Sequence, residues 1–224
     1  MGRKIVTTGD GSHTLEAEGL HEHYHSTFGA ISESRHVFIE AGLHKKLEEK
    51  TDELAILEIG FGTGLNALLT VLDDKIKGTS IHYYAIEAYP LEPELWNKLN
   101  YPEMLEGKRA KDLFESLHHS DWGKPCEIIN GFFLHKLEAK LQDYVHQGKM
   151  IGLVYFDAFG PDVQPDLWTA EIFQKMAGIT APGGILVTYS CKGDVRRALK
   201  NAGFEVEKIP GPKGKREMLR GIRC

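Results

Sequence analysis

Three unbroken apolar runs, separated by stretches of helical character, constrain the fold of this chain more than any other feature. They lie at residues 54–59, 150–156 and 184–189. Strands that are buried on both faces of a parallel sheet read as continuous apolar runs, and the connecting helices cover the two faces. A shorter run at 81–86 and a weaker one at 127–130 extend the pattern. The sequence therefore predicts an α/β fold with a mostly parallel sheet.

The expected helices between these strands lie at residues 64–76, 91–99, 109–118, 133–146, 168–178 and 194–202. Residues 204–209 and 217–222 flank Pro210-Gly211-Pro212 and predict a closing strand pair, with one antiparallel strand near the end of the sheet. At the other end of the chain, residues 3–8 and 12–18 flank Gly9-Asp10-Gly11, which is a hairpin signal, and a helix is expected at 33–50. We therefore expect an N-terminal hairpin and helix extension (residues 1–50) and a Rossmann-like domain (residues 51–224).

Composition excludes several classes of protein. Of the 224 residues, 42% are hydrophobic and 26% are charged, as in ordinary globular chains. No apolar run approaches the ~20 residues of a membrane span, and the first ten residues have no apolar signal core. The three cysteines form no CxxC pair, so we expect a reducing, cytoplasmic location. The eleven histidines form no ligand motif, and we predict no metal site.

A glycine-rich turn follows the first apolar run, in the segment Glu58-Ile-Gly-Phe-Gly-Thr-Gly-Leu-Asn66. Glycines let the backbone turn sharply and approach a ligand closely, and a helix start offers free N–H groups. The spacing is GxGxG, with leucine at position 65, where a dinucleotide fingerprint has its third glycine. Glu87 ends the second strand, where a carboxylate can accept both hydroxyls of a ribose. The combination is typical of class I S-adenosylmethionine (SAM) methyltransferases; a plain turn and a surface acid are the alternatives.

Asp157 follows the run at 150–156, in the motif Asp157-Ala-Phe159-Gly-Pro. Ligands of doubly wound sheets bind outside the carboxyl ends of the strands, so Asp157 is expected in the same crevice as the glycine turn. Methyl transfer from a sulfonium is a direct displacement, in which the protein mainly positions the reactants. Asp157 is a candidate to orient and deprotonate an amine acceptor, and Phe159 to wall the methyl site. A turn-forming Asp157 and a core-packed Phe159 are the alternatives.

Five segments together resemble the methyltransferase domain of the MnmC-type tRNA wobble-uridine modification enzymes. They are ESRHVFIEAG, LEIGFGTGLNAL, VYFDAFGPDVQPDLWT, APGGILVTYS and KREMLRG. The resemblance implies a seven-stranded Rossmann-like sheet with an antiparallel C-terminal strand, SAM as cofactor, and N-methylation of the 5-aminomethyl group of a wobble (2-thio)uridine in tRNA. It also implies a stand-alone form without the oxidase domain of the bifunctional members, so that another enzyme would supply the amine.

The resemblance assigns roles to individual residues. The expected SAM-binding set is Glu58, Gly60, Phe61, Gly62, Thr63, Gly64, Asn66, Glu87, Asn130, Gly131 and Asp157. Tyr24 and the Glu33/Arg35 segment match a stretch beside the cofactor pocket, where Arg35 is a candidate contact to the SAM carboxylate, with a helix-surface salt bridge as the alternative. Lys215, Arg216 and Glu217 match a basic closing motif. The chain departs from the family after the third predicted strand, where Asn130-Gly131-Phe132 replaces the usual Gly-Asp that faces adenine.

Charge distribution predicts the surface that contacts tRNA. The net charge of the chain is −5, but residues 192–224 contain ten Lys or Arg and four Asp or Glu. Lysine and arginine contacts to phosphates dominate affinity for nucleic acids, and an unpaired wobble base can be splayed into a pocket. Lys213, Lys215 and Arg216 are the candidate contacts to the anticodon loop, with a solvated tail as the alternative. Four residues are expected either to line the rim of the pocket or to belong to a solvated loop: His21, His23, Tyr24 and His25.

Three other functions remain open from the residues alone. A SAM-dependent methyltransferase or aminopropyltransferase acting on a small amine would suit the acidic body of the chain. An NAD(P)-dependent oxidoreductase is disfavoured by Leu65 in the glycine turn. A non-catalytic SAM-binding scaffold would leave Asp157 without a chemical role.

Overall fold

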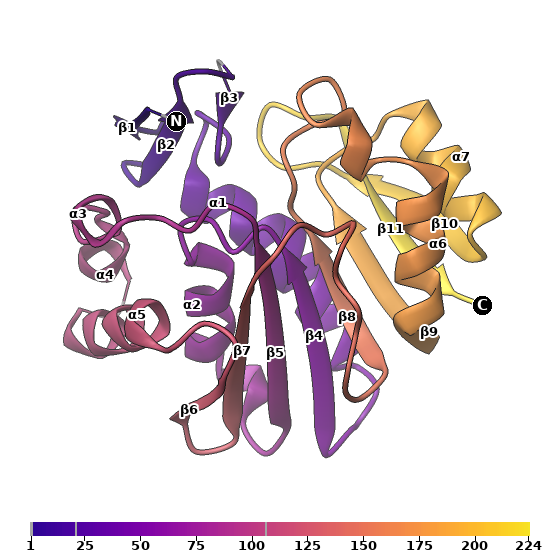
Figure 1. The fold of residues 1–224 in the computed structure, drawn as a ribbon, viewed down its shortest axis with the longest axis horizontal. Helices are drawn as coiled ribbons and strands as arrows, with labels where there is room; N and C mark the ends of the chain where they lie inside the picture. Colours follow the sequence, from indigo (N-terminus) through magenta and orange to yellow (C-terminus); the bar gives the residue numbers. More distant parts are fainter. Residues whose placement is uncertain (1, 21, 106) are drawn as a thin grey trace.

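The computed structural model describes residues 2–20, 22–105 and 107–224, and its centre is a sheet of eight strands. In chain order these are β4 (Glu53–Ile59), β5 (Ser80–Glu87), β6 (Pro125–Ile129), β7 (Phe132–Glu138), β8 (Ile151–Phe156), β9 (Thr180–Thr188), β10 (Phe204–Pro210) and β11 (Glu217–Arg223). The order across the sheet is β10-β11-β9-β8-β4-β5-β7-β6 (Figure 1). Strands β7, β5, β4, β8 and β9 are parallel neighbours, and β11 is antiparallel to both β9 and β10. The predicted α/β class, the mostly parallel sheet and the antiparallel C-terminal strand are confirmed.

Helices cover both faces of this sheet. The helical segments are α1 (Ala30–Ser34), the π-helix η1 (Arg35–His44), α2 (Leu65–Leu72), η2 (Asp74–Ile76), α3 (Pro93–Trp96), α4 (Tyr101–Met104), α5 (Lys108–His119), η3 (Pro165–Leu167), α6 (Ala170–Ile179) and α7 (Gly193–Asn201). One core joins α1, η1, α2 and α5 to the sheet, and a second joins α6 and α7 to the opposite face. Because successive strand residues point to opposite faces, Ile56 enters the first core and Leu57 the second, both fully buried. None of these described helices is long and apolar enough to cross a membrane.

The third strand of the parallel set was assigned incorrectly from the sequence. The predicted helix at 133–146 is wrong: its first half is β7, whose residues alternate between buried and half-buried. The predicted third strand at 127–130 is instead β6, an added edge strand antiparallel to β7, so the sheet has eight strands and not seven. In the sequence, a lysine at a buried position, Lys136, interrupts the apolar alternation that would indicate a strand. Lys136 can be buried because its ammonium donates to the carbonyls of Leu117 and His118, at 2.8 Å each, at the end of α5. Free carbonyls at a helix C-terminus accept such donors readily.

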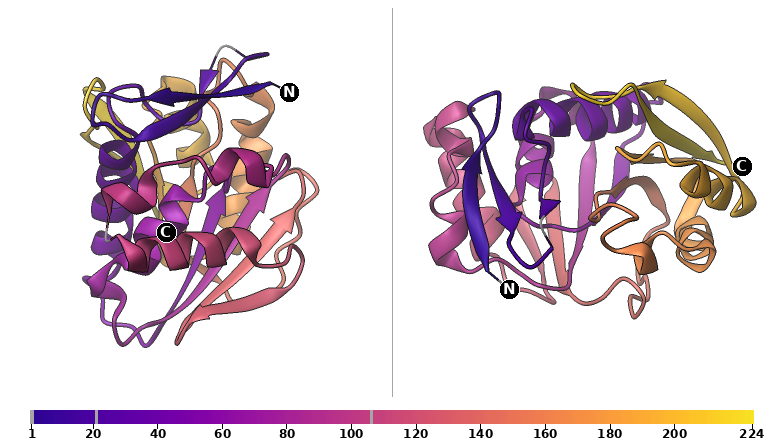
Figure 2. Two further views of the ribbon diagram at one scale, coloured as in Figure 1. Left: turned by 90° about the vertical axis from the view of Figure 1, so that its left-hand side faces the viewer. Right: turned by 90° about the horizontal axis from the view of Figure 1, so that it is seen from above.

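The N-terminal segment forms a separate three-stranded sheet. The predicted hairpin is confirmed as β1 (Arg3–Thr7) and β2 (His13–Ala17), to which β3 (Glu22–His23) adds a short third strand. Figures 1 and 2 show this small sheet above the end of the molecule that also contains α1. The Arg3 guanidinium donates to the Tyr89 carbonyl at 2.6 Å, and Asp10 accepts from the Ser32 N–H at 2.9 Å. These contacts join the hairpin to the loop after β5 and to α1. The domain boundary at residue 50 stays a prediction.

Candidate active site

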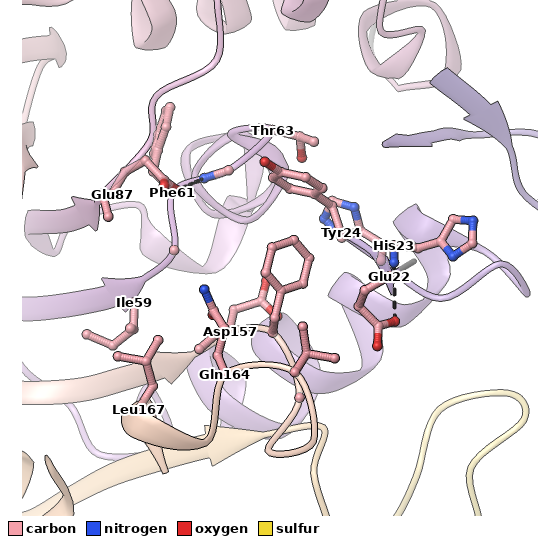
Figure 3. A pocket seen from close by; sticks show the side chains of 18 of the residues that line it. Glu22, His23, Tyr24, Ile59, Phe61, Thr63, Glu87, Asp157, Gln164 and Leu167 are labelled. Carbon is pink, nitrogen blue, oxygen red and sulfur yellow. Dashed lines mark hydrogen bonds between the residues drawn. The ribbon is translucent and has the colours of Figure 1, made fainter. Parts of the chain in front are cut away.

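A cavity of about 700 Å³ opens where the carboxyl ends of β4, β5 and β8 meet the N-terminal segment. The chain passes outward from β4 through β5 to β7 and then returns to β8 on the other side of β4. Ligands of open α/β sheets bind in the crevice at such a reversal of strand order. Figure 3 shows Glu87, Asp157 and Tyr24 at this cavity, and they come from three different segments. Its size lies within the usual range for small-molecule sites.

The structure brings most of the predicted site residues to this cavity. Those that line it are Tyr24, Gly60, Phe61, Gly62, Thr63, Asn66, Glu87, Asp157, Phe159 and Lys215. Glu58 lies just beneath the cavity and is fully buried. His23 and His25 also line it, whereas His21 lies outside the described residues.

The glycine turn supplies a close backbone approach at one side of the cavity. Gly62 has a φ of 48°, and a Cβ there would lie 3.1 Å from the Tyr24 ring. A side chain at this position would therefore enter the cavity. Gly64 does not line the cavity: it has a φ of 73°, and a Cβ there would lie 2.9 Å from the His118 ring. Glycine at position 62 therefore keeps the cavity free of a side chain, and glycine at position 64 lets the start of α2 pack against α5.

Glu87 is held by the backbone with both carboxylate oxygens. Oε2 accepts the Gly62 N–H at 2.9 Å, and Oε1 accepts the Tyr89 N–H at 2.8 Å. A carboxylate has about four acceptor sites, so each oxygen keeps capacity for one more donor. The fixed carboxylate is thus prepared to accept two neighbouring hydroxyl groups, as the ribose assignment requires.

Two carboxyl groups share one amide at the floor of the cavity. The Asn66 Nδ2 amide donates to Glu58 Oε1 at 2.9 Å and to Asp157 Oδ2 at 2.8 Å. Burial raises the pKa of Asp157 well above its usual range, and the Glu33 charge adds to this rise. Burial and the charge of Asp157 likewise raise the pKa of Glu58. A buried carboxyl with a raised pKa accepts a proton more readily than an ordinary carboxylate, and a nearby cation would stabilise its ionised form.

The loop after β8 is held rigidly around Phe159. The Trp168 indole donates to the Phe159 carbonyl at 2.8 Å, and the Tyr189 hydroxyl donates to the Ala158 carbonyl at 2.8 Å. The Phe159 ring meets the Tyr24 ring edge to face, with centroids 5.1 Å apart. Phe159 therefore lies at the cavity wall and not in the main core, and the two rings form an aromatic wall that meets the glycine turn at Gly62.

Two predicted SAM-binding residues lie at the opposite end of the sheet. Asn130 and Gly131 form the turn between β6 and β7, and the pairing of Phe132 with Ile81 puts this turn beside the beginning of β5. Glu87 is at the other end of β5, about 20 Å away at 3.3 Å per residue. Their assignment to adenine recognition is wrong, because β7 and not β6 is the third parallel strand. Residues 139–142, which follow β7, line the cavity instead.

The structure separates the other predicted basic residues from the cavity. Arg35 is exposed and lines a different hollow beside His44, so its predicted contact with the SAM carboxylate is not supported. Lys213 and Arg216 are exposed on the loop between β10 and β11, and only Lys215 of this loop reaches the cavity. Among the other cavity residues, Arg3 and Tyr189 were given no role from the sequence, and Glu33 belongs to the segment that matched a stretch beside the cofactor pocket. Glu33 and Tyr189 stand in two of the resembling segments, ESRHVFIEAG and APGGILVTYS, but neither segment by itself indicates that the side chain reaches the cavity.

Within the described ranges, no group of three or more His, Cys, Asp or Glu residues could hold a metal ion. The donor set fits SAM. Gly62 leaves room where a Cβ would protrude, Glu87 has free acceptor capacity, and Asp157 offers a carboxylate to a cationic sulfonium. The strand order, the glycine turn and the strand-end carboxylate define the fold of the class I SAM-dependent methyltransferases.

Comparison with known proteins agrees with this class. Residues 134–223 match a family model described as S-adenosyl-L-methionine-dependent methyltransferase. The chain is 33% identical over 217 residues to the tRNA 5-methylaminomethyl-2-thiouridine biosynthesis bifunctional protein MnmC of Azoarcus sp. (strain BH72), covering 88% of this chain and 32% of that protein. It is 32% identical to the protein of the same name from Aromatoleum aromaticum, covering 97% of this chain and 35% of that protein.

A solved structure is similar over almost the whole chain. The crystal structure of MNMC2 from Aquifex aeolicus matches with a TM-score of 0.77 and 25% identity, covering 98% of this chain and 70% of that one. The predicted resemblance to the MnmC-type methyltransferase domain and the Rossmann-like fold are confirmed. The chain spans about a third of the length of the curated relatives it matches.

Proposed function

We propose that this chain transfers a methyl group from SAM to the nitrogen of a 5-aminomethyl group on a (2-thio)uridine at the wobble position of tRNA. The name of the MnmC relatives supports the substrate, and the family model supports the cofactor. The observation that carries the proposal is the position of Asp157. Its carboxylate shares one cavity with the glycine turn and Glu87, so a donor and an amine acceptor can meet beside a proton acceptor.

The chain's own residues have to expose and orient the amine. A primary alkylamine is mostly protonated at neutral pH, and it attacks only after losing a proton. Asp157, with its raised pKa, can take that proton when ionised and then hold the remaining N–H by a hydrogen bond. Phe159 and Tyr24 wall the reaction space and exclude water. When bound, SAM would supply a methyl group on a positively charged sulfur: the nitrogen of a neutral amine would form the new bond to the methyl carbon as the carbon–sulfur bond breaks and leaves a neutral thioether.

The substrate has to reach the cavity from a tRNA loop. The wobble base is unpaired, so turning it into a pocket costs little stacking energy. Lys213 and Arg216 are exposed beside Lys215, which reaches the cavity, and they are the proposed contacts to loop phosphates. A tRNA substrate would place the enzyme in the cytoplasm. The amine would come from an earlier reaction at a separate active site.

Mass analysis of tRNA nucleosides tests this proposal. tRNA that carries 5-aminomethyl-2-thiouridine is incubated with SAM and the protein, and the expected product is the wobble nucleoside with one added methyl group. Asp157→Asn should abolish most of the product. Asp162→Asn is a matched control, because Asp162 is an exposed aspartate of the same loop that pairs with Lys192. An unchanged wobble nucleoside, with SAM shown to bind, would remove the substrate assignment.

A small free amine is the second candidate acceptor. Two basic residues of the C-terminal strands are engaged within the chain, since Lys208 pairs with Glu217 and Arg220 with Glu207, both at 2.6 Å. These pairs reduce the positive surface available to RNA. Rates on the free nucleoside and on tRNA distinguish the candidates: a nucleoside that reacts as well as tRNA would favour the small amine.

A further inference from the structure

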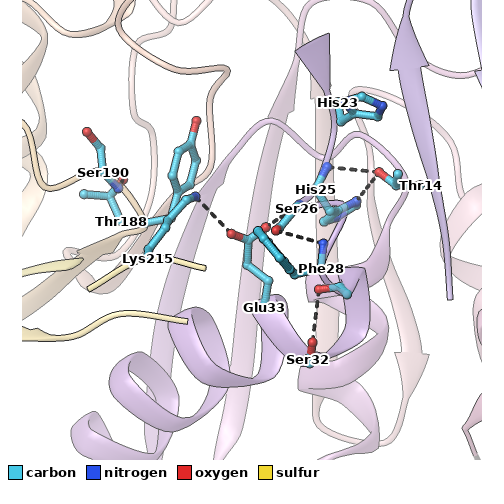
Figure 4. A network of polar contacts seen from close by, with 12 residues as sticks. Thr14, His23, His25, Ser26, Phe28, Ser32, Glu33, Thr188, Ser190 and Lys215 are labelled. Carbon is cyan, nitrogen blue, oxygen red and sulfur yellow. Dashed lines mark hydrogen bonds and ion pairs between the residues drawn. The ribbon is translucent and has the colours of Figure 1, made fainter. Parts of the chain in front are cut away.

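A further carboxylate, besides those of Glu87 and Asp157, lies in the cavity wall and is contributed by Glu33 of α1. Glu33 is only 7% exposed, and its Oε2 accepts the Ser26 N–H at 2.6 Å. Its other oxygen, Oε1, faces the Lys215 ammonium at 3.0 Å (Figure 4). A backbone donor thus fixes one side of the carboxylate, and the other side is directed at a primary ammonium ion.

An aromatic ring completes the surroundings of that ammonium. The Lys215 nitrogen lies 3.9 Å from the centroid of the Tyr189 ring. The hydroxyl of Tyr189 donates to the Ala158 carbonyl, so the ring is anchored to the segment that carries Asp157. An aromatic face together with a carboxylate is a favourable environment for a cation on an alkyl chain.

The lysine that fills this environment comes from a distant, partly exposed loop. The side chain of Lys215 is 36% exposed, and 182 positions separate it from Glu33. A partly exposed pair of this kind contributes little stability, because solvent screens it. The charge of Glu33 raises the pKa of Asp157 and the charge of Lys215 lowers it, so their pair lies within electrostatic reach of the carboxylate that would act on an amine.

We propose that Glu33 and the Tyr189 ring form a binding site for a primary alkylammonium ion, which Lys215 occupies in the free protein and the acceptor's aminomethyl group occupies in the complex. The assignment of the acceptor rests on the proposed function. The acceptor amine enters in its protonated form, displaces Lys215 from Glu33, and lies beside Asp157, which can then remove the proton. Lys215 is released toward the mouth of the cavity, where it can meet a phosphate.

A direct binding experiment tests the site without any methyl transfer. The probe is n-butylammonium, which has the same four-carbon stem and ammonium group as lysine, and calorimetry measures its binding. Removing the competing ammonium in Lys215→Ala should tighten probe binding at least about tenfold over the wild type, the order expected for one charge-assisted hydrogen bond. The same gain should be absent with n-butanol, which lacks the charge. Lys208→Ala removes a lysine of the neighbouring strand β10 that pairs with Glu217 and does not line the cavity, and it should bind the probe as the wild type does.

A second substitution and a kinetic readout keep the result independent of folding defects. Adding Glu33→Gln to Lys215→Ala should remove the gain in probe binding, and Gln can still accept the Ser26 N–H. In the otherwise unchanged protein, Glu33→Gln should raise KM for the aminomethyl substrate about tenfold with SAM affinity unchanged. Equal probe binding by Lys215→Ala and Lys208→Ala, or equal binding of butanol, would overturn the proposal. Failure of the wild type to methylate tRNA would instead refute the proposed function. The binding result for n-butylammonium would still stand, because that measurement involves no methyl transfer.

Discussion

Replacing Glu87 by glutamine tests the cofactor end of the cavity. The two carboxylate oxygens of Glu87 accept the N–H groups of Gly62 and Tyr89 at 2.9 and 2.8 Å. Glutamine places an NH₂ group against one of these backbone donors and removes the negative charge from both acceptors. Hydrogen bonds to charged groups contribute about 1.5–3 kcal/mol, and neutral ones about 0.5–1.5 kcal/mol. Loss of charge from two ribose contacts should weaken SAM binding by about 2–3 kcal/mol, or roughly 30- to 150-fold in Kd.

Titration calorimetry with SAM measures this loss directly, and the chain offers a matched control. Glu138 is paired in register with Glu87 at the end of the neighbouring strand, is exposed, and does not line the cavity. Glu138→Gln removes the same charge about one strand spacing away and should leave the Kd within about twofold. If Glu87→Gln bound SAM as tightly as the wild type, the placement of the ribose on Glu87 would be refuted.

Three further predictions concern the chemistry, the glycine turn and the RNA surface. Asp157→Asn should lower kcat about 10²- to 10⁴-fold with SAM binding retained. Because burial raises the pKa of Asp157, the rate of the wild type should rise with pH over a range above that in which ordinary carboxyl groups titrate. This rise should be absent from the pH–rate profile of the variant. Gly64→Ala should destabilise the fold by about 2–5 kcal/mol in urea unfolding, through its positive φ and contact with His118; unchanged stability would contradict the geometry. Lys213→Ala and Arg216→Ala should each reduce the salt dependence of tRNA binding by about one unit of slope, and identical slopes would exclude them as phosphate contacts.

The parts of the fold that the sequence predicted correctly are those whose burial is visible locally. The runs that became β4, β8 and β9 are apolar on both faces, and the hairpins at both ends of the chain have clear turn residues. Strand β7 was missed because it contains Lys136, a buried lysine whose partners are carbonyls of α5 and the Trp122 ring. Only the tertiary structure supplies those partners. The error then moved the expected adenine site to the wrong end of the sheet.

The cavity shows the same division between local and long-range information. Gly60, Gly62, Glu87 and Asp157 could be placed because parallel strands end at one edge, so each strand-end residue has a known position. No comparable rule predicts the position of the Glu33 side chain, because Glu33 reaches the cavity from a helix that precedes the first strand of the large sheet. Its partner Lys215 was singled out as an RNA contact, and its direction toward a carboxylate inside the cavity depends on the loop conformation alone.

A crystal structure with S-adenosylhomocysteine and the aminomethyl nucleoside would test the central claim most directly. In that structure we expect the ribose hydroxyls on Glu87, the sulfur of S-adenosylhomocysteine facing the acceptor nitrogen, and that nitrogen within hydrogen-bond distance of the Asp157 carboxylate. Electron density for the product elsewhere, or an acceptor nitrogen far from Asp157 with the glycine turn left empty, would contradict it.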